Sequence, residues 1–158
     1  MTSICESNSG ELWITSAGSG AVLLSNPEDR TENFKYKRFE GNQLSDLVFS
    51  SYKMRDGNIM FITDVGIRMY NAKKKSFENF SPRLMPRYFQ ITSMCEDLKG
   101  NIWFGTHHGG VYQYLPKEDT VKIYDIRDGL SSNWIACFCP DRKGNIWIGT
   151  WGGRHYCN

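Results

Sequence analysis

The chain has 158 residues, and 19 Lys and Arg against 17 Asp and Glu give a formal net charge of +2 at pH 7. These charges are spread without runs, so the chain lacks the concentrated basic face that nucleic-acid binding requires. Aromatic residues make up 14% of the chain, and glycine occurs 15 times. This composition is typical of a packed, turn-rich β protein and excludes a disordered one.

Export and membrane signals are not evident in the sequence. No apolar run approaches the length of a membrane span, and residues 1–5 show neither a basic nor an apolar signal region. We therefore expect a soluble segment with no signal peptide and no membrane contact.

A short apolar segment behind a glycine-containing turn recurs along the chain. Residues 97–106, DLKGNIWFGT, return at 141–150 as DRKGNIWIGT, with eight identical positions. Looser copies at 9–16 and 56–63 keep the turn glycine and the apolar run. The glycines of the four turns are Gly10, Gly57, Gly100 and Gly144. Their spacings of 47, 43 and 44 residues indicate a repeat architecture.

The first two copies span about residues 1–46 and 47–90. The first copy begins within its own first strand and has a longer third turn at 26–30. The second is the most degenerate, because Met60 stands where the other copies have Trp and residues 64–66 replace the Gly-Gly turn. The N-terminal half therefore matches the repeat less closely than the C-terminal half.

The third copy, 91–133, is complete and serves as the template. It predicts four strands, at 91–96, 101–106, 111–115 and 121–126. The second strand is apolar on both faces, with Trp103 on one and Ile102 and Phe104 on the other, which is typical of a strand buried between other sheets. Gly100 is expected to adopt the left-handed conformation that the tight turn before this strand requires.

Four antiparallel strands in each repeat predict an all-β protein built from β-propeller blades, with a solenoid of hairpins as the alternative. The fourth copy, 134–158, stops part-way through its third strand. The sequence thus holds about three and a half blades, an incomplete ring. We expect such a chain either to associate with a second copy, giving seven blades, or to be joined by the remaining blades of a longer chain.

Three side-chain positions recur within the repeats. The first is a tryptophan expected to pack in the core, at Trp13, Trp103 and Trp147. The second is a small buried slot, expected to hold free thiols, at Cys5, Cys95 and Cys139. The third is an acidic residue before the turn glycine, at Asp97 and Asp141. We expect these carboxylates to accept hydrogen bonds from turn amides, in preference to binding calcium.

The repeats resemble a known family. The stretches that carry the likeness are 91–97, 100–106, 109–111 and 128–133. They resemble the two-component regulator propeller repeat, strongly in the third and fourth copies, fairly in the first and weakly in the second. In that family such blades form the periplasmic sensor region of hybrid two-component histidine kinases, many of which detect oligosaccharides.

The resemblance implies a non-enzymatic sensing module in signal transduction, located in the periplasm, with an oligosaccharide as its ligand. It implies no catalytic residue, because the kinase modules of such sensors are not in this sequence. Two alternatives remain open. One is an enzyme similar to the propeller lyases that open streptogramin antibiotics, and the other is a structural interaction fragment with no ligand of its own.

In a propeller blade, the turn between strands two and three and the link to the next blade lie on one face, where ligands usually bind. On this chain that face would hold the candidate ligand-binding residues Arg87, His107, His108, Asn133, Trp134, Trp151 and Arg154. Flat apolar rings suit the C–H faces of sugars, and planar polar groups suit their hydroxyls. The alternative is that these are ordinary turn residues and that Trp134 begins a buried strand.

A metal site at the adjacent pair His107 and His108 is not expected. Neighbouring side chains of an extended chain point in opposite directions, and no carboxylate or thiol stands at a supporting spacing. No phosphate-binding loop, nucleophile motif or paired-acid motif occurs either. The sequence therefore predicts neither a metal nor a cofactor.

Overall fold

The computed structural model describes residues 1–25, 36–39, 44–80 and 91–152. The chain forms two compact units, Met1–Phe80 and Ser81–Asn158. The regular secondary structure of the described residues is almost entirely β-strand, with one short 3-10 helix, η2 (Ile126–Asp128), in the second unit. The all-β class predicted from the sequence is confirmed.

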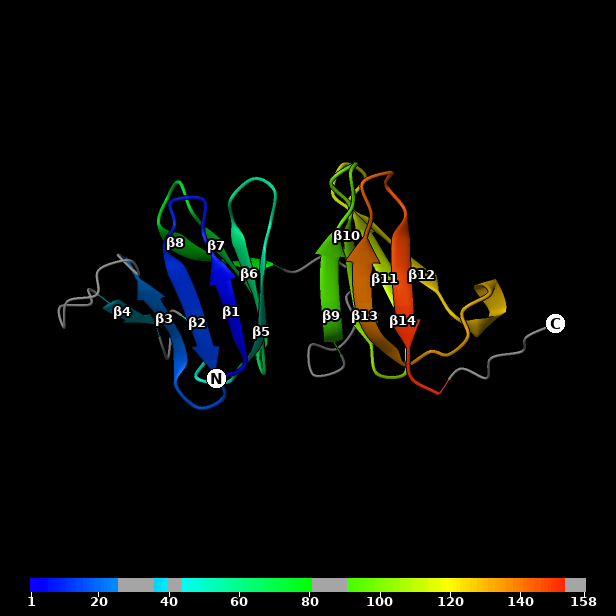
Figure 1. The fold of residues 1–158 in the computed structure, drawn as a ribbon, viewed down its shortest axis with the longest axis horizontal. Helices are drawn as coiled ribbons and strands as arrows, with labels where there is room; N and C mark the ends of the chain where they lie inside the picture. The colour runs from blue at the N-terminus through cyan, green and yellow to red at the C-terminus, as the bar shows by residue number, and fades with distance from the viewer. Residues whose placement is uncertain (26–35, 40–43, 81–90, 153–158) are drawn as a thin grey trace. The chain divides into compact units, whose positions relative to one another are not determined.

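The first unit contains two four-stranded antiparallel sheets, in each of which the strands neighbour one another in chain order (Figure 1). The first sheet consists of β1 (Ser3–Glu6), β2 (Leu12–Ser16), β3 (Gly20–Leu24) and β4 (Tyr36–Phe39). The second consists of β5 (Val48–Lys53), β6 (Ile59–Thr63), β7 (Gly66–Asn71) and β8 (Ser76–Phe80). Each sheet is one predicted blade.

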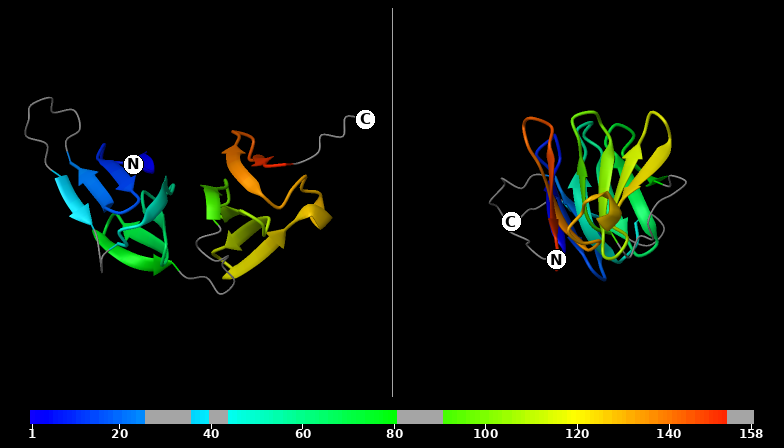
Figure 2. Two further views of the ribbon diagram at one scale, coloured as in Figure 1. Left: turned by 90° about the horizontal axis from the view of Figure 1, so that it is seen from below. Right: turned by 90° about the vertical axis from the view of Figure 1, so that its right-hand side faces the viewer.

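The second unit contains a four-stranded antiparallel sheet and a two-stranded one (Figure 2). The four-stranded sheet consists of β9 (Ile91–Glu96), β10 (Ile102–Thr106), β11 (Val111–Leu115) and β12 (Thr120–Tyr124). The two-stranded sheet pairs β13 (Ile135–Pro140) with β14 (Ile146–Thr150). The fourth strand ends earlier than the sequence predicts, because Asp125 caps η2 by accepting a hydrogen bond from the Arg127 amide at 2.8 Å. The predicted long turn at 26–30 and the end of the fourth copy lie outside the described residues.

The turn between the first two strands of a repeat is closed by side-chain hydrogen bonds, as predicted. Asp97 Oδ1 accepts from the amides of Lys99 (2.8 Å) and Asn101 (2.9 Å), and Gly100 adopts a left-handed φ of 83°. Asp141 makes the same pair of bonds in the fourth copy. In the first copy Ser7 takes this place, and its Oγ accepts from the amides two and four residues later.

The core of the first unit is an aromatic cluster around Trp13. Its indole is 1% exposed and packs against rings from both sheets of the unit. Those rings are Phe39 at 5.2 Å, Phe61 at 5.2 Å, Tyr70 at 4.7 Å and Phe77 at 6.2 Å between centroids. Trp13 therefore faces the following repeat, which covers it.

The prediction that all three repeat tryptophans are core residues is correct for Trp13 and wrong for Trp147. Trp103 is half-buried and stacks on Tyr124 at 5.8 Å, whereas Trp147 is 65% exposed. The indole is buried only when strands of the next repeat cover it. No described residue of the second unit covers the outer face of β14 in the way that β7 and β8 cover Trp13.

The exposure of the repeat cysteines follows that of the repeat tryptophans. Each of these cysteines lies opposite the repeat tryptophan across a strand pair, Cys95 opposite Trp103 and Cys139 opposite Trp147. Cys95 is buried and Cys5 half-buried, but Cys139 is exposed, so the prediction of a buried slot is wrong in the fourth copy. The thiol shares the face of its tryptophan and is exposed when that face is uncovered.

Neighbouring sheets within a unit are joined by an equivalent hydrogen bond. Thr2 Oγ1 donates to the Val48 carbonyl at 2.7 Å in the first unit, and Thr92 Oγ1 donates to the Ile135 carbonyl at 2.6 Å in the second. Thr2 directly precedes β1 and Thr92 is the second residue of β9, and both acceptors begin the first strand of the next sheet. Each bond therefore ties the start of one sheet to the start of the next sheet in the same unit.

Candidate ligand-binding face

The turn between β10 and β11 is held in a fixed shape by Thr106. Its Oγ1 accepts from the Gly109 amide at 2.9 Å and donates to the Gly110 carbonyl at 2.8 Å. Gly110 has a left-handed φ of 75°, and a Cβ there would come within 2.2 Å of the Tyr124 carbonyl oxygen. The turn therefore presses closely on the end of β12, and His107 and His108 project from a braced loop.

The link from η2 into β13 is tied to this turn through Asn133. Its carbonyl accepts from the Gly110 amide at 3.0 Å, and its side-chain Oδ1 accepts from the Ile126 amide at 2.9 Å. The next residue, Trp134, accepts with its carbonyl from the Trp151 amide at 2.8 Å. Three segments distant in sequence are thereby brought to one end of the second unit.

The side chains at this end form an aromatic cluster of His107, His108, Trp134 and Trp151. His107 lies 4.0 Å from the Trp134 ring and 4.6 Å from His108, measured between ring centroids. His108 and Trp151 lie 5.8 Å and 5.9 Å from Trp134. Trp134 is 36% exposed and Trp151 61%, so the cluster offers two accessible indoles to solvent.

Four of the seven residues predicted for this face are therefore brought together. A fifth, Asn133, is adjacent, but its side-chain oxygen already accepts a hydrogen bond from the Ile126 amide. Arg87 and Arg154 lie outside the described residues. Trp134 directly precedes β13, as the alternative reading supposed, but its side chain is 36% exposed and is therefore not buried there.

The expectation that His107 and His108 point in opposite directions is also wrong. Both rings lie near Trp134, because the chain bends at these residues and is not extended there. Among the described residues, no group of three or more His, Cys, Asp or Glu side chains is placed to hold a metal ion.

Two charged residues of this link, Asp125 and Arg127, form an ion pair. Arg127 donates to both carboxylate oxygens of Asp125, and these hydrogen bonds lower the pKa of Asp125. Asp128 in turn accepts from the Asp125 amide at 2.9 Å. The four residues of the aromatic cluster carry no carboxylate, ammonium or guanidinium group, and its recognition chemistry is that of flat rings and imidazole nitrogens.

A second concave surface, which the sequence did not indicate, lies between the two sheets of the first unit. It has a volume of about 740 Å³ and an apolar floor that includes Trp13, Leu23, Phe39 and Ile59. Its rim comes from the β1–β2, β5–β6 and β7–β8 turns, which Figure 1 shows at the same end of the unit. Only the cluster of lysines at 73–75 could have drawn attention to it in the sequence.

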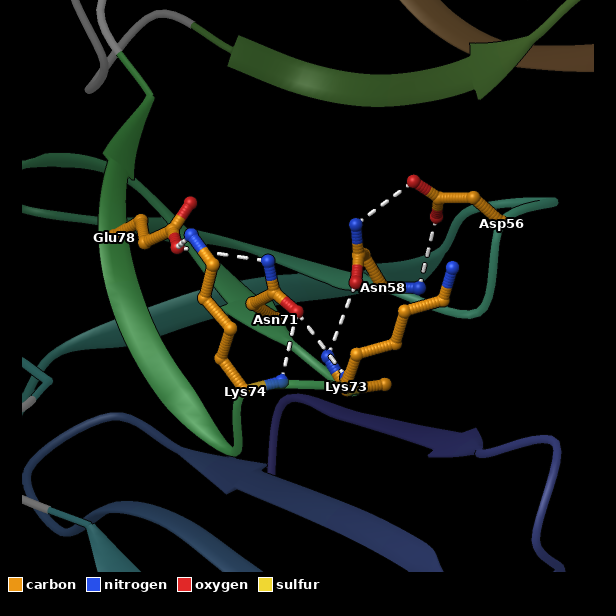
Figure 3. Close-up of polar contacts among 7 residues, drawn as sticks. Asp56, Asn58, Asn71, Lys73, Lys74 and Glu78 are labelled. Carbon is orange, nitrogen blue, oxygen red and sulfur yellow. Dashed lines mark hydrogen bonds and ion pairs between the residues drawn. The ribbon is translucent and has the colours of Figure 1, made fainter.

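The wall of this cleft on the second sheet is a hydrogen-bonded frame (Figure 3). Asn58 donates to Asp56 at 2.7 Å and accepts from the Ala72 amide at 3.0 Å, which joins the β5–β6 turn to the β7–β8 turn. Asn71 Oδ1 accepts from the amides of Lys73 and Lys74, both at 3.1 Å. The two turns are therefore fixed relative to each other.

A smaller cleft of about 430 Å³ lies between the two sheets of the second unit. Trp103 and Asp97 line it from one side, and Ile146 and Ile148 from the other. In the first unit, aromatic rings of β7 and β8 fill part of the equivalent space between the sheets.

Comparison with known proteins identifies the repeat. Residues 129–152 match the repeat family described as two component regulator propeller. The chain carries a two-component regulator propeller repeat. The match covers β13 and β14 and includes Asn133, Trp134 and Trp151 of the candidate ligand-binding face, whereas His107 and His108 lie in the preceding repeat.

Solved structures extend the likeness of this propeller-repeat chain over nearly all of its length. The extracellular domain of the hybrid two component system BT3049 from B. thetaiotaomicron is 32% identical, with a TM-score of 0.71 over 96% of this chain and 20% of that one. The extracellular domain of the one component system BT4673 from the same organism is 17% identical, with a TM-score of 0.74 over 97% and 23%. The chain thus spans about a fifth to a quarter of the length of these structures.

A lyase shares the fold. Virginiamycin B lyase from Staphylococcus aureus is 16% identical, with a TM-score of 0.68 over 93% of this chain and 47% of that one. At this identity the likeness concerns the fold alone. No curated protein sequence matches the chain. In the part of the chain that the structure describes, no helix is both long and apolar enough to cross a membrane.

Proposed function

We propose that this chain is a non-enzymatic, ligand-binding propeller segment of a two-component sensor, exposed to the periplasm or the cell exterior, and that it binds carbohydrate at the aromatic cluster. The observation that carries the proposal is the cluster itself. The repeat brings Trp134 and Trp151 together with their rings accessible, and His107 and His108 add polar edges. Accessible rings beside hydrogen-bonding groups are the usual means of holding a sugar.

The extracellular location is supported by the two relatives from B. thetaiotaomicron, both of which are extracellular domains. The non-enzymatic assignment is supported by the same relatives, which belong to signalling systems. The lyase alternative has less support, because virginiamycin B lyase is only 16% identical to this chain and the likeness concerns the fold.

The proposal is tested by titrating the chain with a panel of neutral oligosaccharides and measuring binding by calorimetry. Trp151→Ala should weaken binding of the sugar that responds at least about tenfold, because an exposed stacking platform is lost. Trp147→Ala is the matched control, since it removes an equally exposed indole outside the cluster, 65% against 61%. Equal losses in the two variants, or no sugar that binds, would contradict the proposal.

A second candidate is an interaction segment, and β14 favours it. Within the described residues β14 pairs only with β13, whereas the equivalent strands β2, β6 and β10 each pair on both sides. An inner strand with an unpaired edge is a template for another strand. Light scattering on the purified chain distinguishes the outcomes, because a defined dimer supports association through such an edge and a monomer opposes it.

A further inference from the structure

The cleft of the first unit carries opposite charges on separate turns. Glu11 lies on the wall formed by the first sheet, directly after the β1–β2 turn, and Lys73 and Lys75 lie on the β7–β8 turn of the second sheet. Asp56 completes the charged rim. Among the described residues that line the cleft, two carboxylates and two ammonium groups balance, so these side chains together favour neither anions nor cations.

The two lysines are available to a ligand. Lys73 and Lys75 are exposed and form no ion pair with a described residue, whereas Lys74 between them is bound to Glu78 at 2.8 Å. Their backbone is held by Asn71 and by the left-handed φ of 53° at Lys75. The backbone of this turn is therefore held in place before any ligand binds, as Figure 3 shows for Asn71 and Lys73.

A tyrosine of the second sheet lies among these charged groups. Tyr70 lines the cleft, and its hydroxyl makes no hydrogen bond with a described residue. Burial raises the pKa of Tyr70, and the charge of Glu11 raises it further, so the carboxylate acts on the phenol across the cleft. Glu11 Oε2 accepts one hydrogen bond, from Ser9 at 2.7 Å. A cationic donor between Glu11 and Tyr70 would satisfy both.

We propose that this cleft binds a zwitterionic ligand with a short apolar side chain, of the class of the aliphatic α-amino acids. The ammonium group would lie between Glu11 and the Tyr70 hydroxyl, and the carboxylate would face Lys73 and Lys75. The apolar side chain would point to the floor. The volume of about 740 Å³ lies in the range of small-molecule sites.

Other ligand classes match the cleft less well. A neutral ligand leaves both lysines and Glu11 without a charged partner, and a simple anion that approaches the lysines also meets Asp56 and Glu11. A zwitterion satisfies both signs together, with charge-assisted hydrogen bonds that are stronger than neutral ones. The site is separate from the aromatic cluster of the second unit, and the proposal does not rest on the function proposed for that cluster.

The experiment is an NMR titration of the ¹⁵N-labelled chain with L-leucine, following the backbone amides of Gly57, Ala72 and Lys73 on the rim. Two matched probes each remove one charge, because N-acetyl-L-leucine lacks the ammonium group and L-leucinamide lacks the carboxylate. Leucine should shift the rim amides, and each probe should bind at least about tenfold more weakly, since one charge-assisted contact is lost.

Variants then assign each charge to its partner. Glu11→Gln should weaken the binding of leucine but leave the binding of N-acetyl-L-leucine unchanged. The double variant Lys73→Ala/Lys75→Ala should weaken the binding of leucine but leave the binding of L-leucinamide unchanged. Lys74→Ala is the control, since it removes the same charge from the same turn but from a side chain paired with Glu78. Circular dichroism of each variant checks that the sheets are retained.

The proposal is overturned if leucine shifts none of the rim amides up to its solubility limit, or if N-acetyl-L-leucine and L-leucinamide bind as well as leucine. It is also overturned if a neutral sugar such as maltotriose shifts the same amides as strongly. Trp151→Ala should leave leucine binding unchanged, so a failure of the sugar site and a failure of this one can be told apart.

Discussion

The indole Nε1 of Trp103 donates a hydrogen bond to Asp97 Oδ2 at 3.0 Å, which ties the repeat tryptophan to the turn that precedes its strand. Trp147 and Asp141 repeat the contact at 3.3 Å. The carboxylate of Asp97 thereby serves the turn amides with one oxygen and the strand with the other. The most characteristic residues of the repeat act as one local unit.

Asp97→Ala should destabilise the chain. The substitution leaves the turn amides and the Trp103 indole without their acceptor in a site where Asp97 is 9% exposed. Leaving buried donors unsatisfied should lower the free energy of unfolding by about 1–3 kcal/mol. Urea denaturation of the variant and the native chain measures this loss. Asp141→Ala removes the same bonds from an exposed turn and should have a clearly smaller effect. Equal effects would show that burial does not decide the contribution of this carboxylate.

Stability should fall in acid through Asp97. Burial on its own would raise the pKa of this carboxyl, but hydrogen bonds from Trp103, Asn101 and Lys99 outweigh burial and lower it. A folded-state pKa below the unfolded value of about 3.9 means that the stabilisation is fully present above that pH and is lost as the pH falls through the folded-state pKa.

Urea midpoints measured from pH 6 down to about pH 2.5 should therefore fall for the native chain below about pH 4. The decline should be shallower for Asp97→Asn, which cannot ionise. If the native chain and the variant show the same slope, Asp97 does not supply this pH dependence.

The cysteines should differ sharply in reactivity. Burial, together with the charge of Asp97, raises the pKa of Cys95 to about 12, so the reactive thiolate is scarce at neutral pH. Cys137 and Cys139 are exposed. Brief treatment of the native chain with iodoacetamide at pH 8, followed by peptide mass spectrometry, should modify the β13 thiols first. Rapid labelling of Cys95 would mean that its site opens readily.

Equivalent tryptophans should contribute unequally to stability. Trp13→Ala removes the centre of the aromatic core and should lower the free energy of unfolding by about 3–5 kcal/mol. Trp147→Ala removes a ring that is 65% exposed, and the change should stay within about 0.5 kcal/mol. Chemical denaturation of the two variants provides the comparison, and a large loss for Trp147→Ala would show that β14 is covered in solution.

Most of the local structure could be predicted from the sequence, because it depends on residues close together in the chain. The glycine spacing predicted the repeat, the alternation of apolar residues predicted the strands, and Asp97 with Gly100 predicted the turn. The strands and the turn are decided within about ten residues by backbone conformation and short-range hydrogen bonds, and the repeat is visible because this local pattern recurs. The same logic placed Trp134 and Trp151 on one face, since both follow from the order of strands within a blade.

The burial of the repeat tryptophans and the cleft of the first unit were decided only by tertiary structure. Trp13, Trp103 and Trp147 occupy the same position of the repeat, yet one is buried, one half-buried and one exposed, because full burial of the indole requires strands of the following repeat. In the same way, Glu11 and Lys73 line one cleft although they lie on different sheets and sixty-two positions apart. Local pattern determines which face of a strand is apolar, and packing between sheets determines whether that face is covered or forms a site.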